Sequence, residues 1–319
     1  MAALQPELLL RRELGNTGLM VTPLCIGTAV LGSMPQVFGY AVDEERALAT
    51  MRMVLEGPIN FIDTGANYSD GESERRIGLA MRERGGLPDD FVLATKADPD
   101  AKTGDFSTAQ VRRSIERSLR LLQVERLQLV YLHEVESVPF EYTMSSGGPA
   151  EGLLRAKEEG LVQHVGVSGG PIELMSKLVK TGAFEVVLSH NRYTLLNTAA
   201  SPLLDLAATH RMAAVNAAPF GGGILIKGPD LVSKYAYAAA SPELLERVHA
   251  IDSLCKRHGV PLAAVALQFS LREPRIATTV VGISRPERVA QTVELAQVLV
   301  PDALWEELRD IGIQHDDLG

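Results

Sequence analysis

Four side chains that can move or guide a proton follow the apolar runs of this sequence. The run that begins at Ile59 ends on Asp63, and a short loop of turn-forming residues places Tyr68 five positions further on. Lys96 and His133 end two later apolar runs in the same way. Because the pKa of an unperturbed tyrosine is ~10, Tyr68 needs a nearby cation before it can act as an acid or base at neutral pH.

Lys96 is the candidate for that cation. Its ammonium, held by Asp63, would stabilise a phenolate and bring the pKa of Tyr68 towards the range that is useful for proton transfer. His133 would donate a hydrogen bond to a substrate carbonyl or hydroxyl and fix its orientation. The four residues contain no nucleophile relay and no clear metal set. They therefore suit proton transfer coupled to hydride transfer with a nicotinamide.

The segments that must position these residues are eight short apolar runs, which alternate with longer segments of helical periodicity. Strands that are apolar on both faces and joined by helical crossovers predict an α/β fold with a parallel sheet covered by helices. Eight such units predict a (β/α)8 TIM barrel, whose strand ends meet at one mouth. The predicted strands are Pro23–Gly27, Asn60–Asp63, Phe91–Lys96, Leu127–His133, Val162–Ser168, Val186–His190, Ala213–Ala218 and Thr278–Gly282.

Turn and cap signals add detail to this barrel. A Gly-Asn-Thr-Gly turn at residues 15–18 predicts an N-terminal β-hairpin. Ser107 and Ser284 each stand three residues before a Gln or Glu, which is the spacing of a helix capping box. The crossover after the seventh strand, from Phe220 to Glu273, predicts a long loop and helical insertion. At this face of a barrel such a loop is typical of a lid or a cofactor clamp.

Composition and charge limit the class of protein. No composition shift or linker divides the 319 residues, so we expect one domain over residues 1–319. The formal net charge of −9 argues against a nucleic-acid partner. No window has the ~18–20 consecutive apolar residues of a membrane span, and the first residues lack a signal-peptide pattern. Cys25 and Cys255 indicate reduced thiols, so we expect a cytoplasmic protein without membrane partners.

Several motifs are similar to those of one enzyme family. They are Phe61-Ile62-Asp63-Thr64 through Tyr68, Ala94-Thr95-Lys96, Tyr131-Leu132-His133, Val165-Gly166-Val167-Ser168 and Ala218-Pro219-Phe220-Gly221-Gly222-Gly223. With them, the chain resembles an aldo-keto reductase along nearly its whole length. Any one motif alone would be a weak signal, whereas the ordered Asp, Tyr, Lys and His on successive barrel units is a specific one.

The resemblance implies roles for these residues. Tyr68 is expected as the general acid/base, tuned by Lys96 and Asp63, while His133 orients the substrate. An extended nicotinamide dinucleotide, NADP or NAD, is expected without a Rossmann domain and without a metal ion. Ser168 is expected near the carboxamide and residues 220–223 along the pyrophosphate. The full set expected at the cofactor is Thr28, Asp63, Ser168, His190, Phe220, Gly221, Gly222, Gly282, Ser284, Arg288 and Thr292.

Three departures from the family pattern concern this cofactor. Ala217 stands where many members stack a tyrosine on the nicotinamide, and Gly169 stands where an Asn is common. Near the adenosine end, Arg288 is present for a 2′-phosphate, but Gly282 replaces the lysine that commonly assists it. One arginine at a helix N-terminus can still bind a phosphate, so both NADP and NAD remain open.

Two segments indicate a branch of the family. Residues 190–196 and 216–220 are similar to enzymes that oxidise free aldoses such as fucose or galactose at C1 to lactones. In the first segment, His190 or Asn191 stands where a glutamine often binds the carboxamide. We therefore expect a sugar or other aldehyde as the small-molecule substrate, and a monomer or small homo-oligomer.

Two other functions remain as hypotheses. Some aldo-keto reductase-like proteins act as NAD(P)H-binding accessory or sensor proteins with little turnover, and Ala217, which provides no stacking ring, leaves room for that role. A metal-dependent barrel hydrolase is disfavoured because the sequence has no His-x-His pair or other evident ligand cluster.

Overall fold

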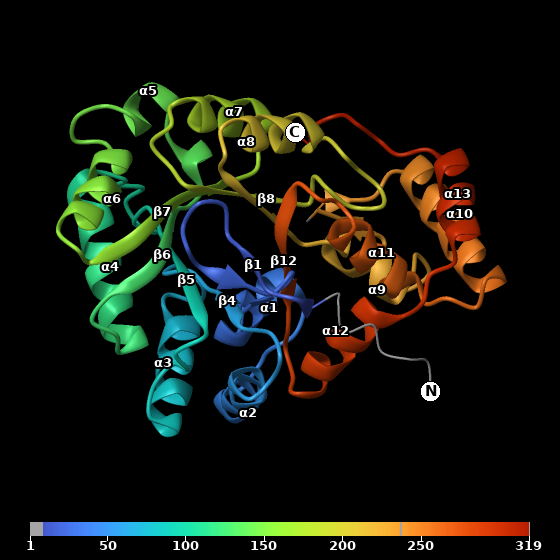
Figure 1. Ribbon diagram of the computed structural model, residues 1–319, viewed down its shortest axis with the longest axis horizontal. Coiled ribbons are helices and arrows are strands. Elements are labelled where there is room, and N and C mark those ends of the chain that lie inside the picture. The colour runs from blue at the N-terminus through green and yellow to red at the C-terminus, as the bar shows by residue number, and fades with distance from the viewer. Residues whose placement is uncertain (1–8, 237, 319) are drawn as a thin grey trace.

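The eight predicted strands close into a parallel barrel in the computed structural model, which describes residues 9–236 and 238–318 (Figure 1). Each strand pairs in parallel with its two neighbours, and β12 closes the ring between β9 and β3. The predicted (β/α)8 architecture is confirmed. The barrel strands are β3 (Leu24–Gly27), β4 (Phe61–Asp63), β5 (Val92–Ala97), β6 (Leu127–Leu132), β7 (Val162–Gly169), β8 (Val186–His190), β9 (Ala213–Ala217) and β12 (Ile276–Gly282).

The strand ends match the predicted ones or differ from them by one or two residues, and β8 matches at both ends. The largest difference is at β12, which begins at Ile276 rather than Thr278, because its ladder with β9 changes register between these residues. At the mouth, β6 ends at Leu132, so His133 begins the loop that leaves this strand.

Helices cover the outside of the barrel, and one of them follows each strand (Figure 1). In chain order they are α2 (Glu44–Leu55), α3 (Glu72–Arg84), α4 (Thr108–Leu122), α6 (Pro149–Glu158), α7 (Ile172–Lys180), α8 (Ser201–Thr209), α11 (Leu262–Leu271) and α12 (Glu287–Gln297). Loop helices are η2 (Ala29–Gly32), α1 (Pro35–Phe38), η3 (Val135–Ser137) and α5 (Phe140–Thr143), and α13 (Asp302–Ile311) is the last helix in the described part of the chain. None of the helices in the described part of the chain combines the length and the apolarity that a bilayer crossing needs.

The insertion predicted between β9 and β12 contains more elements than expected. It holds η4 (Gly221–Gly223), α9 (Ile224–Lys227), a hairpin of β10 (Lys234–Tyr235) and β11 (Ala238–Ala239), and α10 (Pro242–Arg257). Two-residue strands are too short to leave a periodic signal, which is why the hairpin was not predicted. The buried Tyr235 hydroxyl donates to the Asn191 carbonyl at 2.8 Å, so the insertion is tied to the loop that leaves β8.

One of the two predicted capping boxes is wrong. Ser107 caps α4 as expected, and its hydroxyl accepts from the Gln110 N–H at 3.3 Å. Ser284 caps nothing, because α12 begins at Glu287 and its N-cap is Pro286. Pro286 already has helical backbone angles, φ −54° and ψ −42°, so the first turn starts later than the Ser-to-Glu spacing indicated.

The predicted N-terminal hairpin, β1 (Arg12–Glu13) with β2 (Met20–Val21), closes the end of the barrel opposite the strand termini that carry the site. Leu14 is fully buried and belongs to one apolar cluster with residues of the barrel strands such as Phe61 and Leu129. Gly15 lies so close to β9 that an added Cβ would meet the Ala213 nitrogen at 3.0 Å. The hairpin therefore acts as the floor of the barrel.

We expect Leu14→Ala to lower the free energy of unfolding by about 2–5 kcal/mol, because it leaves a cavity at this floor. Urea unfolding with an unchanged denaturant slope would measure the loss. Leu10→Ala is the matched control, since Leu10 is 66% exposed and its truncation should change stability by less than about 0.5 kcal/mol. Equal losses in both variants would contradict a packed floor.

Candidate active site

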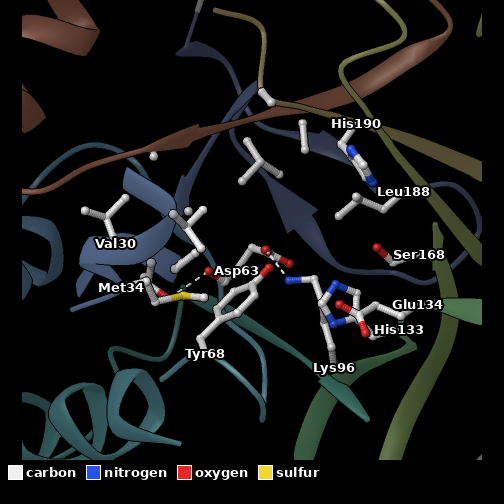
Figure 2. Close-up of a pocket in the computed structure, with 18 of the residues that line it drawn as sticks. Val30, Met34, Asp63, Tyr68, Lys96, His133, Glu134, Ser168, Leu188 and His190 are labelled. Atoms are coloured by element: carbon white, nitrogen blue, oxygen red, sulfur yellow. Dashed lines mark hydrogen bonds and ion pairs between the residues drawn. The ribbon is translucent and has the colours of Figure 1, made fainter. Parts of the chain in front are cut away.

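The four candidate proton-transfer residues converge at one mouth of the barrel. Asp63 ends β4, Lys96 lies near the end of the neighbouring β5, and His133 follows the end of β6. Tyr68 reaches the same place from the loop after β4. All four line one cavity of about 520 Å³, and in Figure 2 their polar ends turn towards one another. We call Asp63, Tyr68, Lys96 and His133 the tetrad.

A buried ion pair forms the base of the tetrad. The side chain of Lys96 is 1% exposed, and its Nζ donates to Asp63 Oδ1 at 2.5 Å and to the Thr64 carbonyl at 2.5 Å. Burial is the largest single influence and alone would lower the pKa of Lys96, but the combined charges and hydrogen bonds of Asp63 and Tyr68 exceed it and the pKa is raised. Lys96 is therefore an ammonium at neutral pH, 4.8 Å from the centre of the Tyr68 ring.

Burial has the largest influence on the pKa of the Tyr68 phenol. It raises the pKa of Tyr68 to about 12, while the charge of Lys96 acts in the opposite direction. The expected lowering by Lys96 is present, but it is smaller than the effect of burial. Tyr68 in this structure is consequently a neutral phenol that can donate a proton, and Lys96 limits the cost of its ionisation.

His133 has a partner that the sequence analysis missed. Its Nδ1 lies 2.5 Å from Oδ1 of Asp98, a carboxylate that is 1% exposed. The rings of His133 and Tyr68 meet edge to face with centroids 5.9 Å apart. A signal for Asp98 was present, because side chains alternate along a strand and a residue two positions after Lys96 faces the same side.

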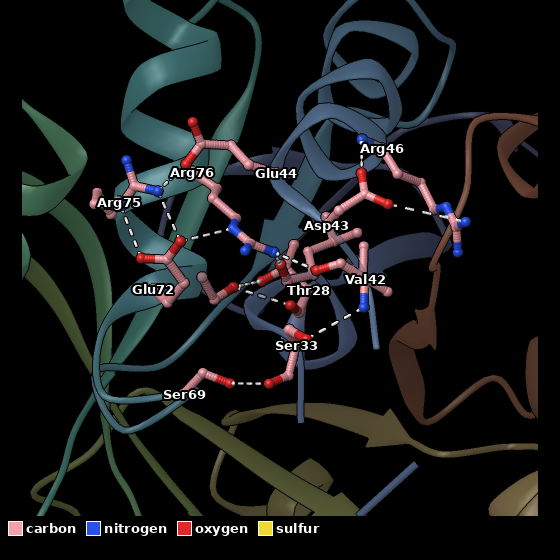
Figure 3. A network of polar contacts seen from close by, with 12 residues as sticks. Thr28, Ser33, Val42, Asp43, Glu44, Arg46, Ser69, Glu72, Arg75 and Arg76 are labelled. Atoms are coloured by element: carbon pink, nitrogen blue, oxygen red, sulfur yellow. Dashed lines mark hydrogen bonds and ion pairs between the residues drawn. The ribbon is translucent and has the colours of Figure 1, made fainter. Parts of the chain in front are cut away.

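A polar network locks the loop after β3 to the tetrad loop (Figure 3). The buried Arg76 of α3 donates to the carbonyls of Leu31 and Val42 at 2.5 and 2.9 Å. Ser73, at the start of the same helix, donates to the Thr28 carbonyl at 2.9 Å. Thr28 in turn donates through Oγ1 to the Asp63 carbonyl at 3.0 Å. The cavity wall formed by η2 and α1 is thereby held against the strand that carries Asp63.

Four of the residues expected at the cofactor line the cavity with the tetrad: Thr28, Ser168, His190 and Gly282. Burial, together with the charge of Arg192, lowers the pKa of His190 to about 4, so its imidazole is neutral at pH 7. Its Nδ1 lies 3.1 Å from Asn191 Nδ2, which is a hydrogen-bond donor. The neutral ring therefore carries its hydrogen on Nε2.

The loop of residues 220–223 has a backbone that only glycine adopts readily. Gly221, Gly222 and Gly223 all have positive φ, at 55°, 76° and 103°. An added Cβ at Gly222 would find only a backbone nitrogen at 3.7 Å, and one at Gly223 would find nothing within 4 Å. Gly221, by contrast, is buried under the Tyr235 ring. The open backbone of Gly222 and Gly223 leaves room for the close approach of a phosphate.

The three remaining predicted cofactor residues, Ser284, Arg288 and Thr292, lie on or just before α12 and outside the cavity of the tetrad. Thr292 is buried, and its hydroxyl donates to the Arg288 carbonyl one turn earlier at 2.8 Å. Its hydroxyl hydrogen is therefore used inside the helix, and only its lone pairs can serve a ligand.

Two buried polar atoms test whether these residues fit a nicotinamide dinucleotide. Oδ2 of Asp63 and Oδ1 of Asn191 have no hydrogen-bond partner among the residues that the structure describes, although buried acceptors are normally satisfied. Both can accept from hydroxyl or amide hydrogens, which a ribose and a carboxamide carry. With the open glycine backbone, the residues present fit such a group. Among residues 9–236 and 238–318, no group of three or more His, Cys, Asp or Glu side chains is placed to hold a metal ion.

The comparison with known families agrees with this geometry. Residues 23–313 match the aldo/keto reductase family. The chain belongs to this family. This aldo/keto reductase is therefore an oxidoreductase. It is 31% identical to L-galactose dehydrogenase from Arabidopsis thaliana over 96% of this chain and 91% of that protein.

A second relative and a solved structure also match this chain over nearly its whole length. The aldo/keto reductase is 29% identical to D-threo-aldose 1-dehydrogenase from a Pseudomonas species, with 92% of this chain and 94% of that protein covered. The holo form of aldo-keto reductase AKR11C1 from Bacillus halodurans has a TM-score of 0.79, over 97% of this chain and 98% of that one. At 22% identity the latter supports the fold. The resemblance to the aldose dehydrogenase branch is thus confirmed.

A buried carboxylate supports β5 from the helix layer. Glu74 of α3 is 0% exposed, and its Oε1 accepts from the Thr95 hydroxyl at 2.6 Å. Burial raises the pKa of Glu74 to about 7, with a smaller contribution in the same direction from Asp98. Hydrogen bonding with the hydroxyls of Thr95 and Ser118 lowers the pKa of this carboxyl, but by less than burial raises it. Folding therefore favours the protonated form of this side chain.

We expect this carboxylate to make stability depend on pH. Its pKa rises from ~4.3 in the unfolded chain to about 7 on folding, so stability falls as pH rises through this interval. Glu74→Gln, which imitates the protonated form, should add about 3–4 kcal/mol to the free energy of unfolding at pH 8 and about 1 kcal/mol at pH 5. Urea unfolding at both pH values, with the exposed Glu246→Gln as control, measures the difference. A gain of equal size at pH 5 would contradict the assignment.

Proposed function

We propose that this protein is an NAD(P)-dependent aldose dehydrogenase that oxidises a sugar hemiacetal at its anomeric carbon. The observation that carries the proposal is the buried Lys96–Asp63 pair beside the Tyr68 phenol, with His133 facing the same cavity. Support for the sugar comes from the two relatives, whose names record L-galactose and D-threo-aldose dehydrogenase activities.

Tyr68 moves the proton in this proposal. When the sugar hydroxyl is oxidised, Tyr68 first has to release its own proton to water. The phenolate, which the fixed charge of Lys96 stabilises, then takes the hydroxyl proton. In the reverse direction the neutral phenol donates the proton to a carbonyl oxygen. The hydride is exchanged with the nicotinamide when that cofactor is bound.

The chain offers separate groups for each part of the dinucleotide. We assign the carboxamide to Ser168, His190 and Asn191, since the first two line the cavity and Asn191 contacts His190. The ribose hydroxyls suit the unpaired Oδ2 of Asp63, and the pyrophosphate suits the open backbone of Gly222 and Gly223. Arg288 supplies one cation for a 2′-phosphate, whereas Gly282 stands where the family commonly has a lysine that would supply a second. NADP and NAD are therefore both candidates.

We expect Tyr68→Phe to lower kcat by about 10²-fold or more, because it removes the acid/base group. The dissociation constant for NAD(P)H, followed by quenching of protein fluorescence, should change by less than about 3-fold. Tyr142→Phe is the matched control, since Tyr142 is exposed and does not line the cavity. Unchanged turnover in Tyr68→Phe would reject the role. Tight cofactor binding by the unmodified protein without turnover of any sugar or aldehyde would instead favour an accessory or sensor function.

The cavity rim is acidic, and this should select the charge of the substrate. Glu134 and Glu136 line the cavity on the loop after β6, and Glu134 has a left-handed backbone with φ 49°. Lys96 is the one Lys or Arg among the described lining residues, and Asp63 already neutralises it. An added phosphate would therefore meet repulsion at the rim. A free sugar carries no charge and should be preferred to its phosphate ester.

We expect kcat/KM for an aldose 6-phosphate to be about 10-fold or more below that for the free aldose. In a water-like medium, the repulsion between each carboxylate and a phosphate charge about 4 Å away is about 1 kcal/mol. The double variant Glu134→Gln/Glu136→Gln should recover about 5- to 10-fold for the phosphate ester while changing the free sugar by less than about 3-fold. Glu141→Gln, exposed on the same loop but outside the lining, is the control. Similar kcat/KM values for both sugars in the unmodified protein would contradict this selectivity.

A further inference from the structure

The segment of residues 314–318, which follows α13, binds the loops that leave β7 and β8. It runs to the side of the barrel where α7 and α8 lie (Figure 1). The Thr198 N–H donates to the Gln314 carbonyl at 2.8 Å. Asn197 Nδ2 donates to the Asp316 carbonyl at 2.9 Å. The 314–318 segment is therefore attached directly to the loop after β8.

The side chain of Arg192 lies at the centre of this contact and is only 7% exposed. Its Nε pairs with Asp317 Oδ1, and its Nη2 donates to the Leu318 carbonyl at 2.7 Å. Its Nη1 donates to the His190 carbonyl at 3.4 Å. A Cβ added at Gly170 would meet the same Nη1 at 2.9 Å. Because Gly170 belongs to the loop after β7, the guanidinium contacts both loops.

Asp317 connects this guanidinium to α7. Its Oδ2 accepts from the Ile172 N–H at 2.8 Å, and Ile172 is the first residue of that helix. The N-cap residue is Pro171, whose side chain cannot accept this hydrogen bond. A carboxylate at a helix N-terminus is also favoured by the helix dipole. One carboxylate therefore holds Arg192 and the start of α7 at fixed positions relative to each other.

The two loops joined in this way carry the side chains assigned to the nicotinamide carboxamide. Ser168 lies four residues before α7 begins, whereas His190 and Asn191 belong to the other loop. Asn191 has a left-handed backbone with φ 60°, so the direction of its side chain depends on how the loop is held. A buried guanidinium is tolerated only with a partner, so loss of Asp317 would release Arg192 from the place where the loops meet.

We propose that Arg192 and Asp317 are positioning residues, which hold the loops after β7 and β8 in the arrangement that binds the nicotinamide of the cofactor. This inference rests on the proposed function and extends its cofactor site to a residue 125 positions further along the chain. Within the described residues, no hydrogen bond joins the 314–318 segment to η4 or α12, where the groups assigned to the phosphates lie. The pair should therefore affect the nicotinamide and not the rest of the dinucleotide.

Ligands with and without a nicotinamide test this assignment. In Asp317→Ala the dissociation constant for NAD(P)H should rise about 10-fold, because the carboxamide groups are no longer held in place. The constant for ADP-ribose, or for its 2′-phosphate where NADPH binds more tightly than NADH, should change by less than about 2-fold. Isothermal titration calorimetry measures both constants. Asp316→Ala is the matched control, since this exposed carboxylate makes no hydrogen bond in the part of the chain that the structure describes.

The outcomes separate the inference from the proposed function. An unchanged affinity for NAD(P)H in Asp317→Ala would overturn the inference. Equal weakening of NAD(P)H and ADP-ribose would also overturn it, because a merely structural role acts on the whole site. Failure of the unmodified protein to bind NAD(P)H would instead count against the proposed function, and the inference would fall with it.

Hydrogen exchange of the unmodified protein gives a second test, which does not depend on whether Asp317→Ala folds. Coupling between two sites is reciprocal, so a segment that favours nicotinamide binding must itself be stabilised when the nicotinamide binds. Saturating NAD(P)H should slow exchange of the Thr198 and Gln314 amides by about 3- to 10-fold relative to saturating ADP-ribose. Equal exchange rates with the two ligands would overturn the inference.

Discussion

The ion pair of Lys96 and Asp63 is the interaction on which the rest of this site depends. A buried ammonium is costly unless a carboxylate and further acceptors surround it, and here Asp63 Oδ1 and the Thr64 carbonyl do so at 2.5 Å each. The pair joins β4 to β5 at the mouth, and the loop that carries Tyr68 begins directly after Asp63. Lys96 therefore fixes both the geometry and the charge that the phenol experiences.

Polar contacts outside the ion pair hold the cavity walls around it. Arg76 of α3 holds the loop after β3 (Figure 3), and α4 holds Asp98, so the helices behind β4 and β5 set the positions of residues on both sides of Tyr68. The hairpin floor at the opposite end closes the barrel without reaching the site. The hairpin floor, which stabilises the barrel, and the candidate active site thus lie at opposite ends of the same strands, as expected for this fold.

Much of this arrangement could be predicted from the sequence, because apolar runs and strand-end polar residues carry a strong local signal. Lys96 at the end of such a run indicated a paired, functional lysine. The raised pKa of Tyr68 could not be predicted, since it depends on how completely other segments cover the ring. Asp98 was missed because its role appears only once β5, β6 and the Asn67 loop are assembled. The capping box predicted at Ser284 was wrong because Pro286, two residues further on, is the N-cap and α12 begins after it.

The most direct test of the central claim follows a labelled hydride. Galactose or fucose deuterated at C1 is incubated with the oxidised cofactor and either the unmodified protein or Lys96→Met, after NAD(P)H binding by both has been verified. The account predicts deuterium in the reduced nicotinamide with the unmodified protein, and transfer slowed by about 10²-fold or more in the variant. Transfer at the same rate in Lys96→Met, or no label from any aldose with the unmodified protein, would contradict it.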